Sequence, residues 1–136
     1  MKTSAGFEHC FNAQTAVDSY RQIVVAAELT QCAADSGELP GMQDAVKRNT
    51  GASPKVALAD AGYRSEAVLE KLCTSPAEVI VALGREGKTQ VAINADKLPR
   101  TAVMATKLES AEGRAKYRRR KAIVEPPNIG INRWPA

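Results

Sequence analysis

The stretch VALADAGYRSEAVLEKL, residues 56–72, decides the fold because its pattern changes at one point. Residues 55–59 form a short, mostly apolar run, which Asp60 and then a glycine follow within two positions. Ser65 is a preferred residue for a helix N-cap, and the apolar residues of EAVLEKL then recur on one helical face. The stretch therefore predicts a strand, a turn and a helix in succession.

The neighbouring segments extend this alternation of elements. Residues 38–49 carry apolar side chains at helical spacing, and AEVIVAL, residues 77–83, has the continuous apolar character of a buried strand. Helix, strand, helix and strand in this order favour parallel strands joined by crossover helices. Upstream, residues 11–18 and 22–30 predict an antiparallel hairpin. We therefore expect an α/β fold, with a mixed sheet made of the hairpin and the parallel strands, and helices packed on it.

The C-terminal third is less regular. Residues 84–107 show no clear period and are predicted to form a loop. A helix is predicted from about Leu108 to Val124, where two prolines follow Glu125. A residue before proline is driven away from helical geometry, so the prolines should end the helix. We expect one domain over residues 1–125 and an irregular tail over residues 126–136.

Basic residues are concentrated in one segment. The chain has 136 residues, the length of one domain, and a formal net charge of +4. Six of its cations lie within residues 114–121. Such a run neutralises DNA phosphates in a salt-dependent manner, although it is also typical of a solvated helix face. The residues predicted to contact DNA are Tyr117, Arg118, Arg119, Arg120 and Lys121.

Cysteine and histidine usage argues against several classes of site. The three cysteines are far apart and odd in number, and His9 is the only histidine, so neither a zinc site nor a disulfide framework is expected. Ser36 and Ser65 have no histidine nearby in the sequence to activate them, so a Ser-His-Asp hydrolase is not expected. No apolar signal core or membrane-length run is present, and the cytoplasm is the expected location.

Two carboxylates are candidates for chemistry. Asp60 follows a strand, and active sites of open α/β sheets lie at the carboxyl ends of strands, although Asp also favours simple turns. Glu125 shares a helical face with Lys121 and Arg118, which indicates either a self-neutralising charged helix or a metal-binding carboxylate beside phosphate-binding cations. Carboxylate oxygens suit Mg²⁺, and two-metal phosphoryl transfer uses such ligands.

Four blocks together carry a resemblance to a known family. In chain order they read FNAQTAVD, QIVVAAELTQ, VALADAGYRSE and GRAKYRRRKAIVEP. Together they resemble the DDE transposases of bacterial insertion sequences over nearly the whole chain. This resemblance implies an RNase H-like catalytic domain in which three acidic residues bind Mg²⁺ or Mn²⁺ and drive DNA strand cleavage and strand transfer. It also implies transposon ends and target DNA as partners, with no membrane.

The resemblance assigns roles to individual residues. Asp60 matches the family's second acid in its Asp-x-Gly-Tyr motif, and Glu125 matches the third acid, which precedes a proline after the basic helix. Both are therefore expected to be catalytic metal ligands. Tyr117, Arg120 and Glu125 echo the family's Tyr, Arg, Glu and Lys signature, with Glu125 one residue farther from Arg120 than usual and Asn132 at the lysine position.

The chain also departs from the family pattern at both ends. No aspartate precedes Phe7, so the first catalytic acid has no counterpart, and the tail EPPNIGINRWPA lacks the family's phenylalanine. We therefore expect a domain truncated at both ends, with an incomplete sheet, no activity alone, and a hairpin edge open to self-association. The alternative is a non-catalytic DNA-binding module that uses the basic helix over residues 114–121.

Overall fold

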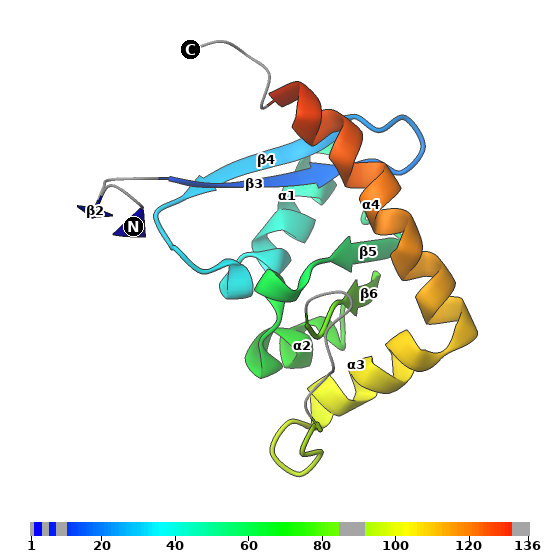
Figure 1. The fold of residues 1–136 in the computed structure, drawn as a ribbon. Helices are drawn as coiled ribbons and strands as arrows, with labels where there is room; N and C mark the ends of the chain where they lie inside the picture. Colours follow the sequence, from blue (N-terminus) through cyan, green and yellow to red (C-terminus); the bar gives the residue numbers. More distant parts are fainter. Residues whose placement is uncertain (1, 4–5, 8–10, 85–91, 132–136) are drawn as a thin grey trace.

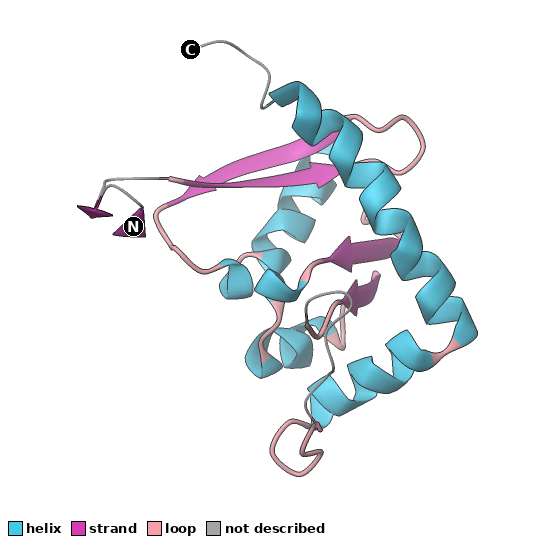
Figure 2. Cartoon of the chain, in the orientation of Figure 1, coloured by secondary structure: helices cyan, strands magenta, loops and turns pink. Residues whose placement is uncertain are grey.

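The structure combines an antiparallel hairpin, a parallel strand pair and four α-helices (Figures 1 and 2). It is a computed structural model that describes residues 2–3, 6–7, 11–84 and 92–131. The predicted α/β class is confirmed. A further short ladder joins β1 (Lys2–Thr3) to β2 (Gly6–Phe7).

The predicted hairpin is confirmed. It consists of β3 (Asn12–Val17) and β4 (Val24–Thr30), which pair antiparallel. The turn is closed by the Asp18 carboxylate, which accepts the backbone N–H groups of Tyr20 at 3.0 Å and Arg21 at 2.7 Å. Asp18 therefore has the turn role that its position after a strand indicates.

The predicted strand–helix–strand unit is also confirmed. The strands β5 (Val56–Ala59) and β6 (Glu78–Val81) pair in parallel, and α2 (Glu66–Leu72) lies between them in the chain. The Ser65 hydroxyl caps α2 by accepting the backbone N–H of Val68 at 3.1 Å. The cap residue is adjacent to the helix in the chain, and α2 begins where the sequence predicts it.

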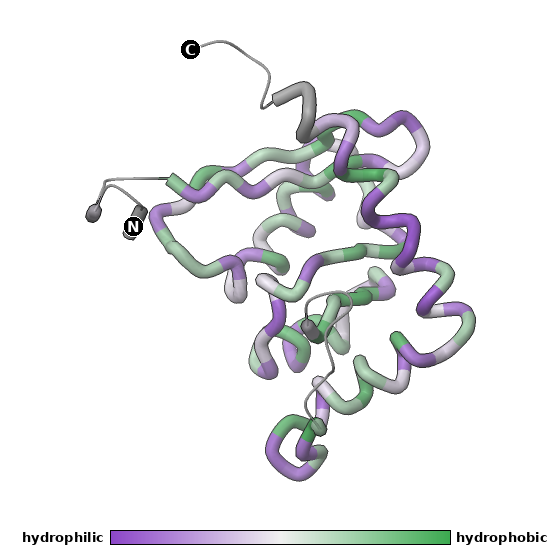
Figure 3. Tube along the Cα trace, viewed as in Figure 1, coloured by the Kyte–Doolittle hydropathy of each residue, from purple (hydrophilic) through white to green (hydrophobic). Residues whose placement is uncertain are grey.

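The core is built around the parallel strands. The tube is largely green, and so apolar, along them (Figure 3). Ile80 and Val81 are fully buried, and α1 (Leu39–Thr50) contributes Met42 to a second, smaller cluster beneath the hairpin. The main cluster consists of Leu39, Ala59, Val68, Leu69, Leu72, Val79, Ile80, Val81, Leu83 and Met104.

The loop predicted over residues 84–107 is wrong in its second half, where α3 (Pro99–Glu109) forms. Pro99 is tolerated in the first turn of the helix. The Glu66 carboxylate accepts the backbone N–H groups of Arg100 at 2.5 Å and Thr101 at 3.0 Å, and so caps α3 from α2. This cap comes from a residue more than thirty positions away, so local periodicity does not reveal it. Residues 85–91 lie outside the described residues.

The helix end predicted at the prolines is also wrong. The last helix, α4 (Ala111–Ile131), continues through Pro126 and Pro127. The irregular conformation predicted after Glu125 is therefore wrong for residues 126–131, and residues 132–136 lie outside the described residues. The helix also begins later than the predicted start near Leu108, because α3 occupies that position.

A side chain from the hairpin compensates for one of these prolines. Pro126 has no N–H to donate to the carbonyl of Ala122, four residues earlier. The Gln22 side chain donates Nε2–H to that Ala122 oxygen at 2.7 Å. Gln22 lies in the turn of the hairpin with φ 56, an uncommon value for a residue other than glycine. The turn thus supplies the hydrogen bond that α4 loses.

The hairpin and the parallel pair form separate ladders. Among the described residues, β3 pairs only with β4, and β5 pairs only with β6. The expected elements of the mixed sheet are present, but no described hydrogen-bonded ladder joins the two halves. Within the described part of the chain, no helix has the length and apolar character of a membrane span.

Candidate functional site

Asp60 lies where β5 ends and a short 3-10 helix, η2 (Ala61–Tyr63), begins. Its Oδ1 accepts the backbone N–H of Gly62 at 2.9 Å, which caps η2. The residue is exposed. Asp60 therefore performs the turn role that its local pattern indicates, and its carboxylate remains at the carboxyl end of a parallel strand, where chemistry is commonly found.

A polar network links this turn to the hairpin. The Tyr63 hydroxyl donates to Gln14 Oε1, and Gln14 Nε2 donates to Asp35 Oδ1 at 2.7 Å. Asn12 Nδ2 donates to the same Asp35 oxygen at 2.6 Å. Burial, followed by the negative charges of Asp35, Asp60 and Glu38, raises the pKa of Tyr63 to about 12. Tyr63 therefore stays a hydroxyl donor at neutral pH and holds the acidic turn against β3.

Asp35 and Asp60 converge at Gly62. A Cβ atom added to Gly62 would lie 2.8 Å from Asp35 Oδ2 and 3.0 Å from Asp60 Oδ1. These two oxygens therefore lie within 5.8 Å of each other, the sum of the two distances. In the sequence, Asp35 is predicted to be a loop residue. The segments α1 and β5 separate it from Asp60 along the chain. No local signal in the sequence identifies this pairing.

The basic segment lies on α4. Arg118, Arg119 and Lys121 are exposed, whereas Tyr117 and Arg120 are partly buried. Tyr117 packs against the main core, and the Arg120 guanidinium lies 5.7 Å from the centroid of its ring. Neither Arg118 nor Arg119 forms an ion pair with any residue that the structure describes. Three of the four predicted DNA-contacting cations are thus exposed, Arg120 is partly buried, and Tyr117 anchors the helix.

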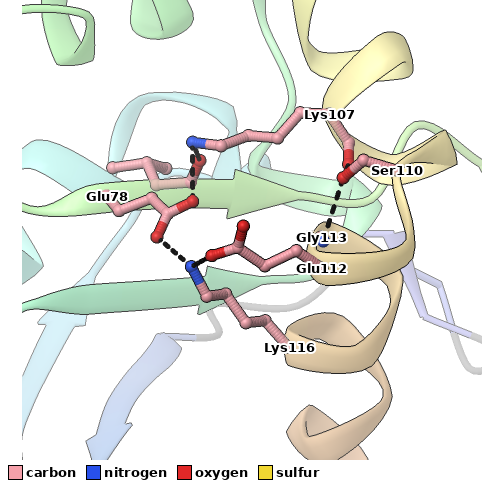
Figure 4. Close-up of polar contacts among 7 residues, drawn as sticks. Glu78, Lys107, Ser110, Glu112, Gly113 and Lys116 are labelled. Carbon is pink, nitrogen blue, oxygen red and sulfur yellow. Dashed lines mark hydrogen bonds and ion pairs between the residues drawn. The ribbon is translucent and has the colours of Figure 1, made fainter.

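An ion-pair network fixes the start of α4 against β6 (Figure 4). Glu78 on β6 pairs with Lys107 of α3 at 3.3 Å and with Lys116 of α4 at 2.7 Å. Lys116 also pairs with Glu112 at 2.5 Å, one helical turn away. Lys116 and Lys107 together hold the pKa of Glu78 below its ordinary value. Lys116 therefore positions the helix, and Arg118, Arg119 and Lys121 beyond it are exposed.

A glycine allows the sharp corner between α3 and α4. The Ser110 hydroxyl accepts the backbone N–H of Gly113 at 3.0 Å and donates to the Lys107 carbonyl at 2.7 Å (Figure 4). A Cβ atom on Gly113 would meet the Lys107 carbonyl oxygen far inside 3.0 Å, which real Cβ atoms essentially never show. The corner therefore requires glycine at this position.

Only some of the predicted site residues share one region. Asp60, Arg119 and Arg120 line a single cavity of about 840 Å³ between β3, β5, α1 and α4. Glu125 is exposed on α4 and does not line this cavity. In Figure 1, β5 points away from α4, so Asp60 lies at the strand end farther from that helix. Asp60 and two basic residues of α4 thus line one large cavity without a contact between them, and Glu125 lies outside its lining.

Comparison with known families decides the assignment. The family model described as transposase DDE domain matches residues 2–129. The chain belongs to this family. Comparisons of this DDE domain with curated proteins and with solved structures find no match. The hairpin, the parallel pair and the four helices are consistent with the RNase H-like domain of DDE transposases.

Membership in the DDE family implies DNA transposition, DNA binding and the use of a divalent metal. Asp35 and Asp60 offer carboxylate oxygens that suit Mg²⁺. However, the part of the chain that the structure describes contains no group of three or more His, Cys, Asp or Glu residues placed to hold a metal ion. The described residues of this DDE domain therefore do not form a complete metal site.

Proposed function

We propose that the chain is part of the catalytic domain of a bacterial insertion-sequence DDE transposase. It acts in the cytoplasm on transposon ends and target DNA, with Mg²⁺ or Mn²⁺ as the metal. The family match over residues 2–129 carries this proposal. The exposed Arg118 and Arg119 support it, because they leave cations available for DNA phosphates.

Asp60 and Glu125 are proposed as the second and third catalytic acids. Asp60 has the position at the end of a strand that such a ligand needs, with Arg119 and Arg120 around the same cavity. Glu125 does not line that cavity, and the described residues contain no group of three or more side chains placed to hold a metal ion. The chain is therefore proposed to be inactive alone, because its acids do not converge.

A nicking assay on supercoiled plasmid tests this proposal. The chain is incubated with plasmid and Mg²⁺ or Mn²⁺, and Asp60→Asn is assayed in parallel. The expected result is no more relaxed plasmid than in buffer, for both proteins. Robust nicking by the chain that is lost in Asp60→Asn would contradict inactivity and support the role of Asp60. Nicking that Asp60→Asn retains would contradict the role of Asp60 itself.

A second candidate function is DNA binding without catalysis, through the basic helix over residues 114–121. The exposure of Arg118 and Arg119 and their lack of ion pairs within the described residues favour it. Nicking by the chain that Asp60→Ala removes would assign catalysis to Asp60 and contradict the second function. DNA binding that Asp60→Ala leaves unchanged and that Arg118→Gln with Arg119→Gln weakens is what the second function predicts.

A further inference from the structure

The turn of the hairpin carries an aromatic ring and a cation on its surface. Tyr20 is 83% exposed, and the Arg21 guanidinium lies 5.2 Å from the centroid of its ring. Arg21 is also exposed and forms no ion pair with any residue that the structure describes. We call these two residues the turn pair. An exposed aromatic residue is common on protein surfaces and by itself indicates no partner, but the support and the surroundings of the turn pair do indicate one.

The turn pair is held on a fixed backbone. Its two backbone N–H groups both donate to the Asp18 carboxylate, at 3.0 Å from Tyr20 and 2.7 Å from Arg21. Two backbone hydrogen bonds also close the turn, from the Asp18 N–H to the Ile23 carbonyl at 2.9 Å and from the Gln22 N–H to the Asp18 carbonyl at 3.0 Å. Because the turn is already ordered, a partner that contacts the turn pair does not have to order its backbone, which lowers the entropic cost of binding.

The turn pair lies beside the basic segment of α4. Gln22, which follows Arg21 directly, donates its side-chain Nε2–H to the Ala122 carbonyl at 2.7 Å. Lys121 precedes Ala122, and Arg118 lies four residues, about 6 Å of helix rise, before it. Figure 1 shows the turn of the hairpin next to the C-terminal half of α4. The turn pair therefore extends the basic surface of α4 and is not an isolated patch.

Two carboxylates lie in the same region. Asp18 is partly buried, and its carboxylate already accepts the two N–H groups of the turn pair. Glu125 is exposed on α4, four residues after Lys121. Arg21, Arg118 and Lys121, all exposed, outnumber these two carboxylates. The region is therefore positively charged and suits an anionic partner.

An exposed ring among cations fits an unpaired nucleic-acid base. Proteins that hold single strands combine cations that follow the phosphates with aromatic rings on which bases stack. An acidic peptide would pair with the cations but would not use the ring. The bases of an intact duplex are stacked on one another, so a side chain can stack only on a base that is outside the duplex. The partner that uses both members of the turn pair is therefore DNA with an unpaired base beside the duplex, since the family match implies DNA.

We propose that the turn pair is a second DNA contact, at which Tyr20 stacks on an unpaired base next to the duplex bound by α4. Arg21 binds the phosphate beside that base. This inference rests on the proposed contact between α4 and DNA and adds to it a preference for duplex with a single-stranded extension over a fully paired duplex.

Fluorescence anisotropy of the whole chain with two labelled DNAs tests the proposal. One DNA is a blunt duplex, and the other is the same duplex with a short single-stranded extension; EDTA prevents metal-dependent cleavage. Stacking of one base changes affinity by a factor of roughly 5 to 100, so the wild type should bind the extended duplex more tightly by a factor in this range. Tyr20→Ala should reduce the affinity for the extended duplex to that for the blunt duplex, whereas Tyr20→Phe keeps the ring and the preference.

Two further measurements separate stacking from a general effect on the fold. A 2-aminopurine at the first unpaired position should lose fluorescence when the wild type binds, because stacking quenches it, and should not do so with Tyr20→Ala. Arg21→Gln should reduce the slope of log K against log salt by about 0.7 for the extended duplex. Phe11→Ala is the matched control, because Phe11 is 64% exposed and precedes β3 at the end of the hairpin opposite the turn. It should leave both affinities unchanged.

The outcomes distinguish this inference from the α4 contact on which it rests. Equal affinities of the wild type for the two DNAs would overturn the inference, as would a preference that Tyr20→Ala retains or that Phe11→Ala also removes. If Arg118→Gln with Arg119→Gln weakens binding to the blunt duplex in the same experiments, the α4 contact stands without the turn pair. A preference lost in Tyr20→Ala, with unchanged binding of the blunt duplex by the α4 variant, would support the turn pair and contradict the α4 contact. No binding to either DNA would overturn both.

Discussion

The start of α3 depends on one carboxylate of α2, and replacing Glu66 should destabilise the domain strongly. Glu66 accepts three hydrogen bonds, two from the backbone N–H groups of Arg100 and Thr101 and one from the Thr101 hydroxyl at 2.7 Å. Thr101 is only 3% exposed, so water cannot easily replace the lost partner. Removing the acceptor therefore leaves polar groups buried without partners.

The size of the effect follows from these contacts. An unsatisfied buried polar group costs about 1–3 kcal/mol, and loss of a helix N-cap typically costs about 1 kcal/mol. Because one carboxylate serves all three donors, we expect Glu66→Ala to lower the free energy of unfolding by about 3 kcal/mol. Glu66→Gln keeps one acceptor oxygen and should cost about 1.5 kcal/mol. With a urea m-value of about 1.5 kcal/mol/M, the midpoint for Glu66→Ala should fall by about 2 M.

Glu70 offers a matched control on the same helix. It pairs with the Arg100 guanidinium in an exposed ion pair, at 3.0 Å for the bond between Oε1 and Nη2. Solvent and salt screen such an exposed pair, so Glu70→Gln should shift the urea midpoint little. If Glu66→Ala were no more destabilising than Glu70→Gln, the capping role of Glu66 would be refuted.

The pH dependence of the same site has a definite sign. Burial raises the pKa of Glu66, but the hydrogen bonds from Thr101 and Arg100 outweigh it and lower the pKa below 4.5. A carboxylate with a lowered pKa stabilises the folded state above its unfolded pKa and loses that contribution as the pH falls through the folded pKa. The stability difference between the wild type and Glu66→Gln should therefore shrink below pH 4.5.

Three further predictions use urea unfolding or spectroscopy. Gly113→Ala should lower the free energy of unfolding by about 1–3 kcal/mol, because the new Cβ meets the Lys107 carbonyl. Gly41→Ala adds a Cβ in open space in α1 and should raise the free energy of unfolding by about 0.4–1 kcal/mol. Equal effects of the two substitutions would contradict the corner geometry. Gln22→Ala should lower the free energy of unfolding by about 0.5 kcal/mol, because water can replace the lost donor to the exposed Ala122 carbonyl, and unchanged exchange of amides after Ala122 would count against this. Because the pKa of Tyr63 is raised to about 12, its hydroxyl stabilises the folded state below pH 10, and this contribution is lost as the pH rises toward 12. Tyr63→Phe should remove this pH dependence of stability. A Tyr63 pKa near 10 in an ultraviolet titration would disprove the prediction.

Local signals predicted the elements whose causes are local. The succession of strand, helix and strand patterns over residues 55–83 predicted the parallel unit. The Ser65 hydroxyl caps α2 by accepting the N–H of Val68, only three residues later in the chain. The hairpin was predictable because its two strands are consecutive and its turn is closed by Asp18. In these cases the residues that stabilise an element lie within or beside it.

The elements that the sequence did not predict depend on distant partners. The first turn of α3 is capped by the Glu66 carboxylate of α2. The helix α4 continues through Pro126, and the Gln22 side chain of the hairpin turn donates a hydrogen bond to the Ala122 carbonyl that Pro126 leaves free. The approach of Asp35 to Asp60 likewise arises only when the hairpin and β5 are placed side by side. Hydropathy patterns contain no information about such contacts. The roles of Asp60 and Glu125 as metal ligands stay predictions.

The salt dependence of DNA affinity tests the central claim that this DDE domain contacts DNA through α4. Fluorescence anisotropy with duplex DNA is measured over a salt series for the wild type, for Arg118→Gln with Arg119→Gln, and for Lys47→Gln with Lys71→Gln. The last variant has the same charge change at exposed positions away from α4. Each lost phosphate contact reduces the slope of log K against log salt by about 0.9, so the α4 variant should lose about 1.8. A wild-type slope in the α4 variant, or an equal loss in the lysine variant, would contradict the claim.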